Sequence, residues 1–224
     1  MPFKFTSDMS VEDADKLAEN LGIKHSIIPI GEIYDSFQNS LECEFRGLEP
    51  DITEENLQSR CRGVILMALS NKSGEIVLTT GNKSETAVGY STLYGDTAGG
   101  FGVLKDVPKT LVYELARYRN TISKVIPERI IDRPPSAELA PDQQDSDSLP
   151  DYDTLDKIIE LYVEQDKSKK EIEESGIESS VLNRVIRLID FSEYKRRQAP
   201  LGVKITSRGF GKDRRYPITN KFLK

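Results

Sequence analysis

The sequence predicts an α/β fold: a partial open parallel sheet flanked by helices, followed by a helical C-terminal part. Helical and extended patterns alternate through residues 1–120, an order typical of parallel βαβ units with right-handed crossovers. An apolar, β-branched run over residues 76–80 ends in the turn Gly81-Asn82, directly before a helix-like segment. Open α/β sheets bind ligands at such strand ends, where a helix N-terminus favours anions.

The N-terminal elements follow from capping and periodicity. Ser10 is predicted to cap a helix that runs to Leu21, with apolar residues at helical spacing and Gly22 as its stop. The elements predicted next are a strand over residues 25–30, a helix over 32–41, a helix over 54–69 capped by Thr53, and a strand over 75–80.

After a predicted helix over residues 110–119 the pattern changes. Five prolines punctuate residues 121–150, which are predicted to be irregular and mobile. An apolar stripe at helical spacing then opens a helical part over residues 151–194, with predicted helices at 152–165, 169–174 and 179–194. A basic tail over residues 195–224 completes what is interpreted as a single domain, 1–224.

The sheet is predicted to be incomplete. Two strands are clear and residues 3–5 are a possible third, whereas an open sheet of this kind usually has about five or six. Helices with this many apolar positions would lack a full sheet to cover. The chain is therefore interpreted as part of a domain.

Composition excludes several classes of protein. With 37% hydrophobic and 30% charged residues, no apolar run near the length of a membrane helix and no signal-peptide pattern, a membrane partner is not expected. Cys43 and Cys61 lack metal-ligand spacing, which favours free thiols and a cytoplasmic location. A net charge of −6 argues against general nucleic-acid affinity. The basic tail is nevertheless predicted to meet phosphates or an acidic surface, with a solvated terminus as the alternative.

The chemistry of the site is concentrated between residues 75 and 119. Hydroxyls, one carboxylate, glycines and a lysine stand at predicted element ends, a combination that suits a nucleotide and its metal ion. Each part also has a plain structural interpretation. A Gly-Asn turn is often only a turn, and Glu85 in a first helical turn complements the helix dipole.

The amino-acid sequence of these segments resembles that of a known family. TTGNKSE, GYSTLYGD, AGGF, LKDVPKT and LVYELARYRN are similar to the synthetase domain of glutamine-dependent NAD⁺ synthetases. The opening MPFKFTSDMSVEDADKLAENLGI and the tail strings EYKRRQAP and KITSRGFGKDRRYPITNKF resemble the same family, so the likeness covers essentially the whole chain. It implies an adenine nucleotide alpha hydrolase-like fold of the PP-loop ATPase type.

The resemblance also implies a reaction. In this family ATP adenylates the carboxylate of nicotinic acid adenine dinucleotide (deamido-NAD), pyrophosphate leaves, and ammonia then displaces AMP to give NAD⁺. Mg²⁺ accompanies the ATP, and a separate glutaminase domain supplies the ammonia from glutamine. A homodimer or higher homo-oligomer is expected from the family, and no nucleic-acid partner is expected.

Site residues are carried over from the family's motifs. Thr80, Lys109 and Ser136 match ATP-binding positions, and Ser136 stands where ammonia-dependent relatives have Thr. Glu85 matches the carboxylate that holds Mg²⁺ and meets deamido-NAD. The other residues implied to bind deamido-NAD are Asn56, Arg60, Tyr90, Ser91, Thr92, Leu93, Lys195 and Arg196. No residue is assigned as catalytic.

Three further positions carry weaker interpretations. Asp96 could belong to the ligand site or cap its own loop. His25 matches no functional position and is interpreted as structural. Gly100 stands where ammonia-dependent relatives have a ligand-binding Asp, so that contact is not transferred.

Two parts of the family pattern do not occur in this sequence. The pyrophosphate-binding string SGGxDS is missing, and so is the nitrilase-like glutaminase domain. The chain is therefore expected to be an N-terminally truncated synthetase domain with little activity alone, the alternative being a catalytically inactive nucleotide-binding paralogue. A less favoured alternative is a helix-turn-helix-like nucleic-acid module built from residues 152–194 and the basic tail.

Overall fold

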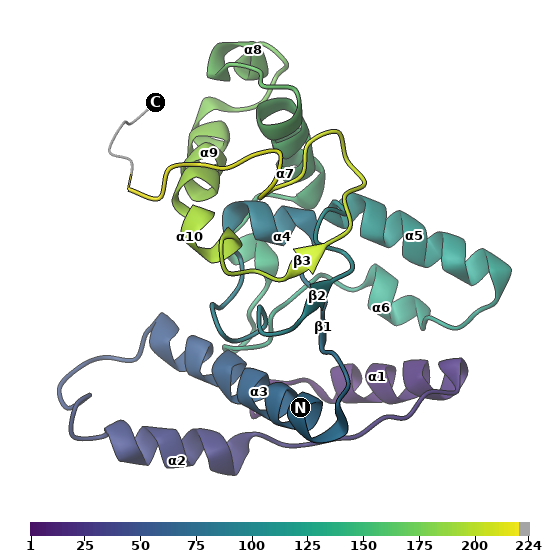
Figure 1. Cartoon of the computed structure of the whole chain (residues 1–224), viewed down its shortest axis with the longest axis vertical. Helices are drawn as coiled ribbons and strands as arrows, with labels where there is room; N and C mark the ends of the chain where they lie inside the picture. The colour runs from purple at the N-terminus through teal and green to yellow at the C-terminus, as the bar shows by residue number, and fades with distance from the viewer. Residues whose placement is uncertain (220–224) are drawn as a thin grey trace.

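The computed structural model describes residues 1–219 and shows a small sheet between two helical regions (Figure 1). Three helices lie below the sheet and the C-terminal helices lie above it. The helices are α1 (Asp8–Leu21), α2 (Gly31–Leu41), α3 (Ile52–Ser73), α4 (Lys83–Val88), α5 (Lys109–Ile122), α6 (Glu128–Asp132), α7 (Tyr152–Ile159), α8 (Lys169–Glu173), α9 (Ser179–Phe191) and α10 (Glu193–Arg196). A 3-10 turn, η1 (Asp145–Asp147), and a π-helical turn, η2 (Glu160–Glu164), complete the helical elements.

The sheet is parallel, as predicted, and small. Its strands β1 (Leu78–Thr79), β2 (Phe101–Gly102) and β3 (Leu201–Gly202) lie in the order β1-β2-β3. Leu78 pairs with Phe101, and Phe101 pairs with Leu201. The sequence pattern located β1, although with longer bounds, and missed β2 and β3. Both are too short to show an alternating pattern, and each contains a glycine.

The strands predicted over residues 25–30 and 3–5 are wrong. Both segments are irregular, and Ile27 is 51% exposed. Among the described residues, a backbone hydrogen bond from Ile30 N to Pro2 O, at 3.1 Å, links residues 25–30 to the residue just before 3–5. One such bond does not make a ladder, so an apolar run without a neighbouring strand stays extended but unpaired.

The helices occur where the sequence predicts them, with corrected caps. Ser7, not Ser10, caps α1, and its side chain accepts from Ser10 N; Gly22 ends this helix with φ of 63° as predicted. Asp51, not Thr53, caps α3, and Glu54 completes a capping box there. In both cases two capping residues lie within a few positions, and the sequence pattern favoured the wrong one.

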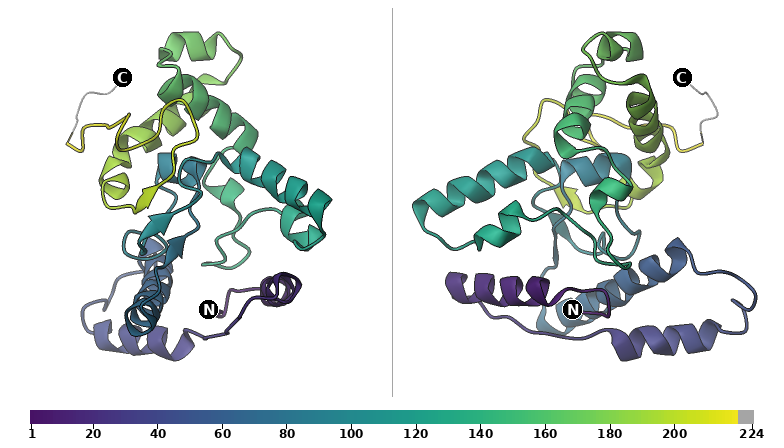
Figure 2. Two further views of the ribbon diagram at one scale, coloured as in Figure 1. Left: turned by 45° about the vertical axis from the view of Figure 1, so that its right-hand side comes forward. Right: turned by 180° about the vertical axis from the view of Figure 1, so that it is seen from behind.

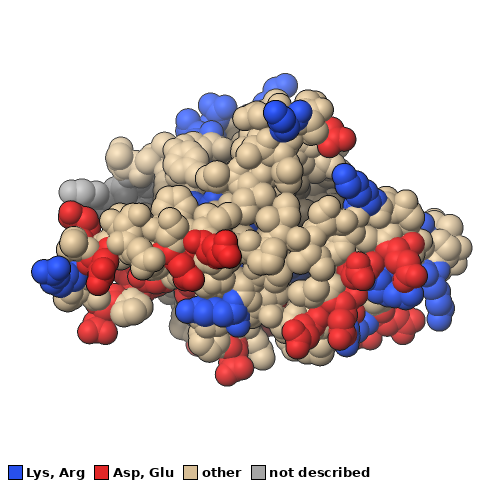
Figure 3. Space-filling model, turned by 90° about the horizontal axis from the view of Figure 1, so that it is seen from below, with Lys and Arg blue, Asp and Glu red and all other residues tan. Residues whose placement is uncertain are grey.

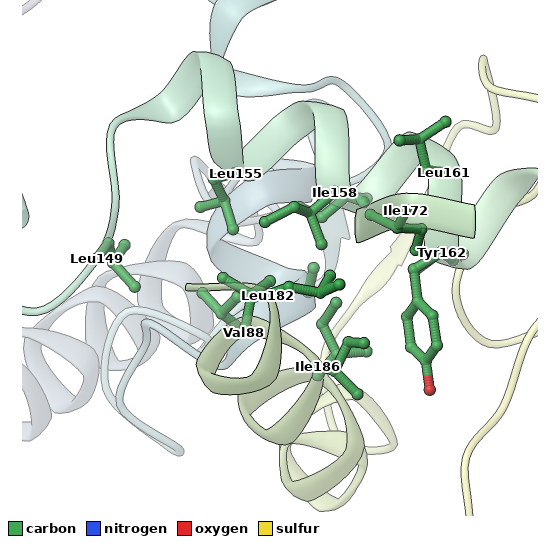
Figure 4. Close-up of a cluster of buried hydrophobic side chains, with 14 of the residues drawn as sticks. Val88, Leu149, Leu155, Ile158, Leu161, Tyr162, Ile172, Leu182 and Ile186 are labelled. Atoms are coloured by element: carbon green, nitrogen blue, oxygen red, sulfur yellow. The ribbon is translucent and has the colours of Figure 1, made fainter. Parts of the chain in front are cut away.

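The main hydrophobic core lies in the C-terminal helical part. The stripe predicted in residues 155–162 is buried and packs against α4 and α9 (Figure 4). Fully buried members are Leu155, Ile158, Val163, Ile172, Leu182, Val185 and Ile189. A second, smaller core of Ile30, Tyr34 and Cys61 joins α2 to α3. Because α4 packs on the larger core, the turn that begins α4 has a rigid base.

Residues 121–150 contain more structure than predicted. They include α6, which packs beside α5 (Figure 2), and η1. The predicted helix over residues 179–194 is divided at Ser192 into α9 and α10. Of the basic tail, residues 220–224 lie outside the described part of the chain. No helix within residues 1–219 is both long and apolar enough to cross a membrane.

Candidate functional site

One groove of about 710 Å³ brings together most of the predicted site residues. Its walls are the first half of α3, the start of α5, helix α6, and the loops over residues 89–96 and 133–145. The predicted residues that line it are Asn56, Glu85, Tyr90, Ser91, Thr92, Lys109, Ser136 and Lys195. These positions span most of the sequence, and the fold brings them together at one site.

Two charged groups of the groove, Glu85 and Lys109, pair with each other. Asn82 caps α4, and Glu85 closes a capping box in which Oε2 accepts from Asn82 N at 3.2 Å. Its other oxygen, Oε1, lies 3.0 Å from Lys109 Nζ at the start of α5. Burial acts to lower the pKa of Lys109, but the charge and hydrogen bond of Glu85 outweigh it and the net shift is upward. Lys109 therefore stays cationic at neutral pH.

The wall over residues 89–92 is held by Lys195. Gly89 ends α4 with φ of 69°, and Lys195 Nζ donates to Gly89 O at 2.7 Å and to Ser91 O at 2.6 Å. Burial lowers the pKa of Lys195. Thr92 Oγ1 donates to Asn56 Oδ1 at 2.8 Å, so α3 is tied to the same wall. Lys195 thus shapes the groove through the backbone as well as lining it.

Asp145 is a groove residue that the sequence analysis missed. Its carboxylate is buried and accepts hydrogen bonds from Tyr90 Oη at 3.1 Å and Tyr152 Oη at 2.6 Å. Burial, together with this carboxylate, raises the pKa of both tyrosines. Lys109 Nζ lies 5.2 Å from the Tyr152 ring centre. In the sequence Asp145 is one of several acids in a polar stretch, so nothing marked it.

Asp96 and Ser136 are fixed by local hydrogen bonds. Asp96 Oδ1 accepts from Thr92 N at 2.6 Å and from Ser59 Oγ at 3.3 Å, so it organises its own loop and also lines the groove. Burial raises the pKa of Asp96, although these hydrogen bonds act in the opposite direction. The Ser136 hydroxyl donates to Gln143 O.

Four predicted residues do not line the groove. Thr80 is exposed, just beyond the end of β1. Arg60 is exposed and its Nε donates to Leu93 O at 3.2 Å, which joins two predicted residues outside the groove. Arg196 is buried, and its guanidinium donates to Glu193 Oε2, Ala87 O and Ile189 O. The ligand contacts of these four residues stay predictions.

The residues of the groove could supply only some of the ligands that Mg²⁺ needs. No cluster of three His, Cys, Asp or Glu side chains able to hold a metal occurs within residues 1–219. Glu85 is a single carboxylate at the edge of the groove. Mg²⁺ that accompanies a nucleotide is typically held by one or two carboxylates together with phosphates. Glu85 is compatible with that role and with no dedicated protein cage.

Other sequence interpretations can be compared with the structure. His25 lies away from the groove, and its Nδ1 is 3.1 Å from Asp15 Oδ1. Several tail cations meet acids of the same chain: Lys204 Nζ lies 2.7 Å from Asp213, and Arg208 and Arg214 both pair with Asp166. This pairing neutralises part of the positive charge on which binding to nucleic acid would depend.

Comparisons with known proteins identify the family. Residues 1–199 match the model of the NAD synthase family. The chain is 57% identical over 222 residues to a glutamine-dependent NAD(+) synthetase of Acinetobacter baylyi, covering 98% of this chain and 41% of that protein. A relative with the same description from Aquifex aeolicus is 54% identical, at 100% and 40% coverage. The chain therefore spans about 40% of the length of these curated relatives.

Solved structures agree. The glutamine-dependent NAD+ synthetase from Acinetobacter baumannii, described in complex with adenosine diphosphate, is 51% identical, with a TM-score of 0.60 over 97% of this chain and 39% of that one. NMN synthetase from Francisella tularensis is 28% identical, with a TM-score of 0.73 over 87% of this chain and 73% of that one. The helix-flanked parallel sheet predicted from the sequence is confirmed, and this chain belongs to the NAD synthase family.

Proposed function

We propose that this chain holds a synthetase site that amidates deamido-NAD to NAD⁺ at the expense of ATP. The observation that supports it is the groove, in which eight residues implied to bind ATP or deamido-NAD converge in a chain of the NAD synthase family. The groove also has apolar surface for bases and rings, from Val112, Tyr113, Ile131 and Leu139. A dinucleotide needs both kinds of lining.

The reaction has two steps. A carboxylate oxygen of the nicotinate attacks the α-phosphorus of ATP, the bond to the bridging oxygen breaks, and pyrophosphate leaves. The nitrogen of ammonia then attacks the carboxyl carbon of the acyl adenylate. The bond from this carbon to the phosphate oxygen breaks, AMP leaves with that oxygen, and the nitrogen loses a proton. The first step turns a poor electrophile into a reactive one, so the protein must hold two nucleotides together and stabilise developing negative charge.

The residues divide this task. We assign Lys109 to the ATP phosphates, because its ammonium stays charged and Glu85 is its present partner. Mg²⁺ would be held in part by Glu85 and, when bound, would neutralise phosphate charge. Asn56 and Thr92, which bond each other, are assigned to deamido-NAD together with the Tyr90–Ser91 wall. Ser136 is assigned to ATP, and Lys195 to holding the wall in place.

The protein at its natural full length, supplied with deamido-NAD, ATP, MgCl₂ and ammonium chloride, tests this function; the 224-residue chain alone is expected to show little activity. We expect NAD⁺, AMP and pyrophosphate to appear in equal amounts, measured by enzymatic cycling and chromatography. Nicotinic acid mononucleotide is the matched control substrate, because one similar structure is described as an NMN synthetase. Amidation of the mononucleotide but not the dinucleotide, or release of ADP in place of AMP, would contradict the proposal.

Three wider features belong to the same proposal. Glutamine is the proposed source of ammonia in the protein at its natural full length, which replacing ammonium chloride with glutamine would test. A homodimer or higher homo-oligomer is proposed, with light scattering after gel filtration as its measurement. The cytoplasm is the proposed location, supported by the free thiols of Cys43 and Cys61.

A further inference from the structure

Lys83 is a buried lysine that the proposed reaction does not use. It is the first residue of α4, two positions before Glu85, and its side chain has 0% exposed surface. A cation at a helix N-terminus opposes the helix dipole, and a buried ammonium is costly unless it is fully paired. Its surroundings must therefore offset both costs.

Four oxygen groups surround this ammonium. Lys83 Nζ lies 2.7 Å from Glu164 Oε1, 3.1 Å from Asp106 Oδ1 and 3.0 Å from Arg208 O, and it also donates to Thr206 Oγ1. Glu164 ends the π-turn η2, and Asp106 lies between β2 and α5. The remaining two partners belong to residues 201–216, here called the C-terminal strap. Lys83 thus joins α4 to three separate parts of the fold.

The same two carboxylates hold the strap itself. Asp106 Oδ2 accepts from the backbone N–H groups of Ile205 and Thr206, both at 2.8 Å, and Glu164 Oε2 accepts from Ser207 Oγ at 2.9 Å. Three consecutive strap residues are therefore fixed around Lys83. Figure 1 shows the strap in yellow, running from β3 across the C-terminal helices. π-turns such as the one that places Glu164 are frequent at functional sites.

The first turn of α4 is fixed on three sides by three consecutive residues. Lys83 reaches the strap. Ser84 Oγ bonds Asp156 of α7 and accepts from Lys109 N at 2.8 Å. Glu85 faces the groove and Lys109 Nζ. Release of the strap would therefore loosen the turn that positions Glu85 and Lys109.

We propose that Lys83 is a positioning residue: by fastening the C-terminal strap to the first turn of α4, it fixes Glu85 and Lys109 in the groove. The proposal rests on the function proposed above and adds a part of the chain, the strap, to the machinery of that site. It gives Lys83 no contact with substrate.

The test is Lys83→Met in the protein at its natural full length. Met keeps the length and apolar body of Lys and removes the charge. Lys204→Met is the matched control, because Lys204 is a strap lysine whose exposed ammonium pairs with Asp213. Amide hydrogen exchange over residues 83–88, without ligand and well below the melting temperature, is the primary measurement. We expect exchange there to accelerate at least tenfold in Lys83→Met and to change less than twofold in Lys204→Met.

Calorimetric titration with ATP in MgCl₂ gives the second measurement. We expect Lys83→Met to weaken ATP binding about tenfold. Lower thermal stability with unchanged exchange at residues 83–88 and unchanged ATP affinity would show a purely structural lysine and overturn the proposal. If Lys83→Met does not fold, Thr206→Val keeps every charge and removes the strap hydroxyl that bonds both Lys83 and Asp106. It should show the same two changes at smaller size. Absence of both changes in folded Thr206→Val would also overturn it.

The two proposals fail separately. If the parent protein makes no NAD⁺ but Lys83→Met accelerates exchange at residues 83–88, the proposed function is wrong and the coupling by Lys83 stands. If the parent makes NAD⁺ and exchange is unaffected, the function stands and the coupling is wrong.

Discussion

At the scale of single residues, Glu85 combines a structural and a functional position. It closes the capping box of α4 through Oε2 and presents Oε1 to Lys109. Glu85→Gln keeps an acceptor for the cap and removes the charge. We expect turnover to fall by roughly 10²-fold or more, because the charge is lost where Mg²⁺ and phosphates are proposed to bind.

Glu171→Gln is the matched control for that substitution. Glu171 closes the equivalent capping box of α8 with Ser168, away from the groove. Melting curves of the two variants should shift little and to a similar degree, while steady-state NAD⁺ synthesis should differ sharply. Turnover of Glu85→Gln near that of Glu171→Gln would exclude the metal-binding role.

Arg196 gives a prediction about stability. Its guanidinium is buried, pairs with the buried Glu193, and stacks over the rings of Phe210 and Tyr216. Arg196→Met leaves Glu193 without its buried partner, so we expect a loss of about 3–5 kcal/mol in unfolding free energy. Arg197→Met removes the partly exposed second partner of Glu193 and should cost within about 1 kcal/mol. Urea unfolding of both variants measures the difference; equal losses would contradict this account of Arg196.

Most site residues that could be predicted from the sequence belong to long, specific strings, with Asn56 and Ser136 as exceptions. Glu85, Tyr90 and Lys109 were found because TTGNKSE, GYSTLYGD and LKDVPKT resemble a family. Asp145 and Lys83 were missed as functional candidates for a physical reason. Each acts through partners tens of residues distant, Tyr90 in one case and Glu164 in the other, and no local pattern records such a contact.

At the scale of elements, Gly89 joins helix α4 to the groove wall. It has φ of 69°, and a Cβ there would lie 2.3 Å from the buried Ser192 Oγ. Gly22 ends α1 with φ of 63° but has nothing within 4 Å of that position. Gly22→Ala should therefore lower the free energy of unfolding by about 1 kcal/mol, from the strain of the left-handed backbone alone. Gly89→Ala should lower it by about 1–3 kcal/mol more, because the new Cβ would overlap Ser192 Oγ.

The same pair separates stability from binding. Lys195 Nζ bonds Gly89 O, so displacement of Gly89 also moves the wall that includes Ser91. We expect Gly89→Ala to raise KM for deamido-NAD several-fold, and Gly22→Ala to leave KM unchanged. Chemical denaturation and initial-rate kinetics on the two variants provide the comparison. Equal KM values would mean that the wall does not depend on the end of α4.

Most helices were predictable, whereas β1 was the only strand of the described sheet that the sequence located, for reasons visible in particular elements. Helix α1 has its own cap, its own stop and its own apolar face, all between Ser7 and Gly22. Strand β3 consists of Leu201 and Gly202, both exposed, and exists because β2 lies beside it. Residues 25–30 have the converse property: their composition favours a strand, but no ladder partner lies beside them in the described chain.

At the scale of the whole molecule, the fold brings together opposite charges that lie far apart in the sequence. Asp166, for example, pairs with Arg208 and Arg214 of the basic tail. Other acids remain on the surface: Figure 3 shows them toward both ends of the face that carries α1 and α2, with uncharged surface between them. Ion pairs within the fold thus neutralise part of the positive charge that the sequence gathers in its tail.

Stability should also depend on pH, and the pKa values of Asp106 and Asp96 are shifted in opposite directions. Burial acts to raise the pKa of Asp106, but hydrogen bonds from Thr206 and Ile205 and the charge of Lys83 outweigh it, and the net shift is downward. Its contribution is fully present above the unfolded pKa of about 3.8 and is lost as pH falls through the lower folded value. Burial raises the pKa of Asp96, so its carboxylate destabilises the fold increasingly as pH rises above about 3.8 toward the folded value.

Urea unfolding of the parent, Asp106→Asn and Asp96→Asn between about pH 2.5 and 7 tests both signs. As pH falls each parent carboxyl takes up a proton and becomes more like the neutral amide, so the differences among the three free energies of unfolding should shrink. As pH rises, Asp106→Asn should become less stable than the parent and Asp96→Asn more stable. Parallel curves for the three proteins would show that neither carboxylate is linked to folding. Asp96→Asn falling below the parent at neutral pH would show that the hydrogen bonds from Thr92 and Ser59 outweigh the burial of Asp96.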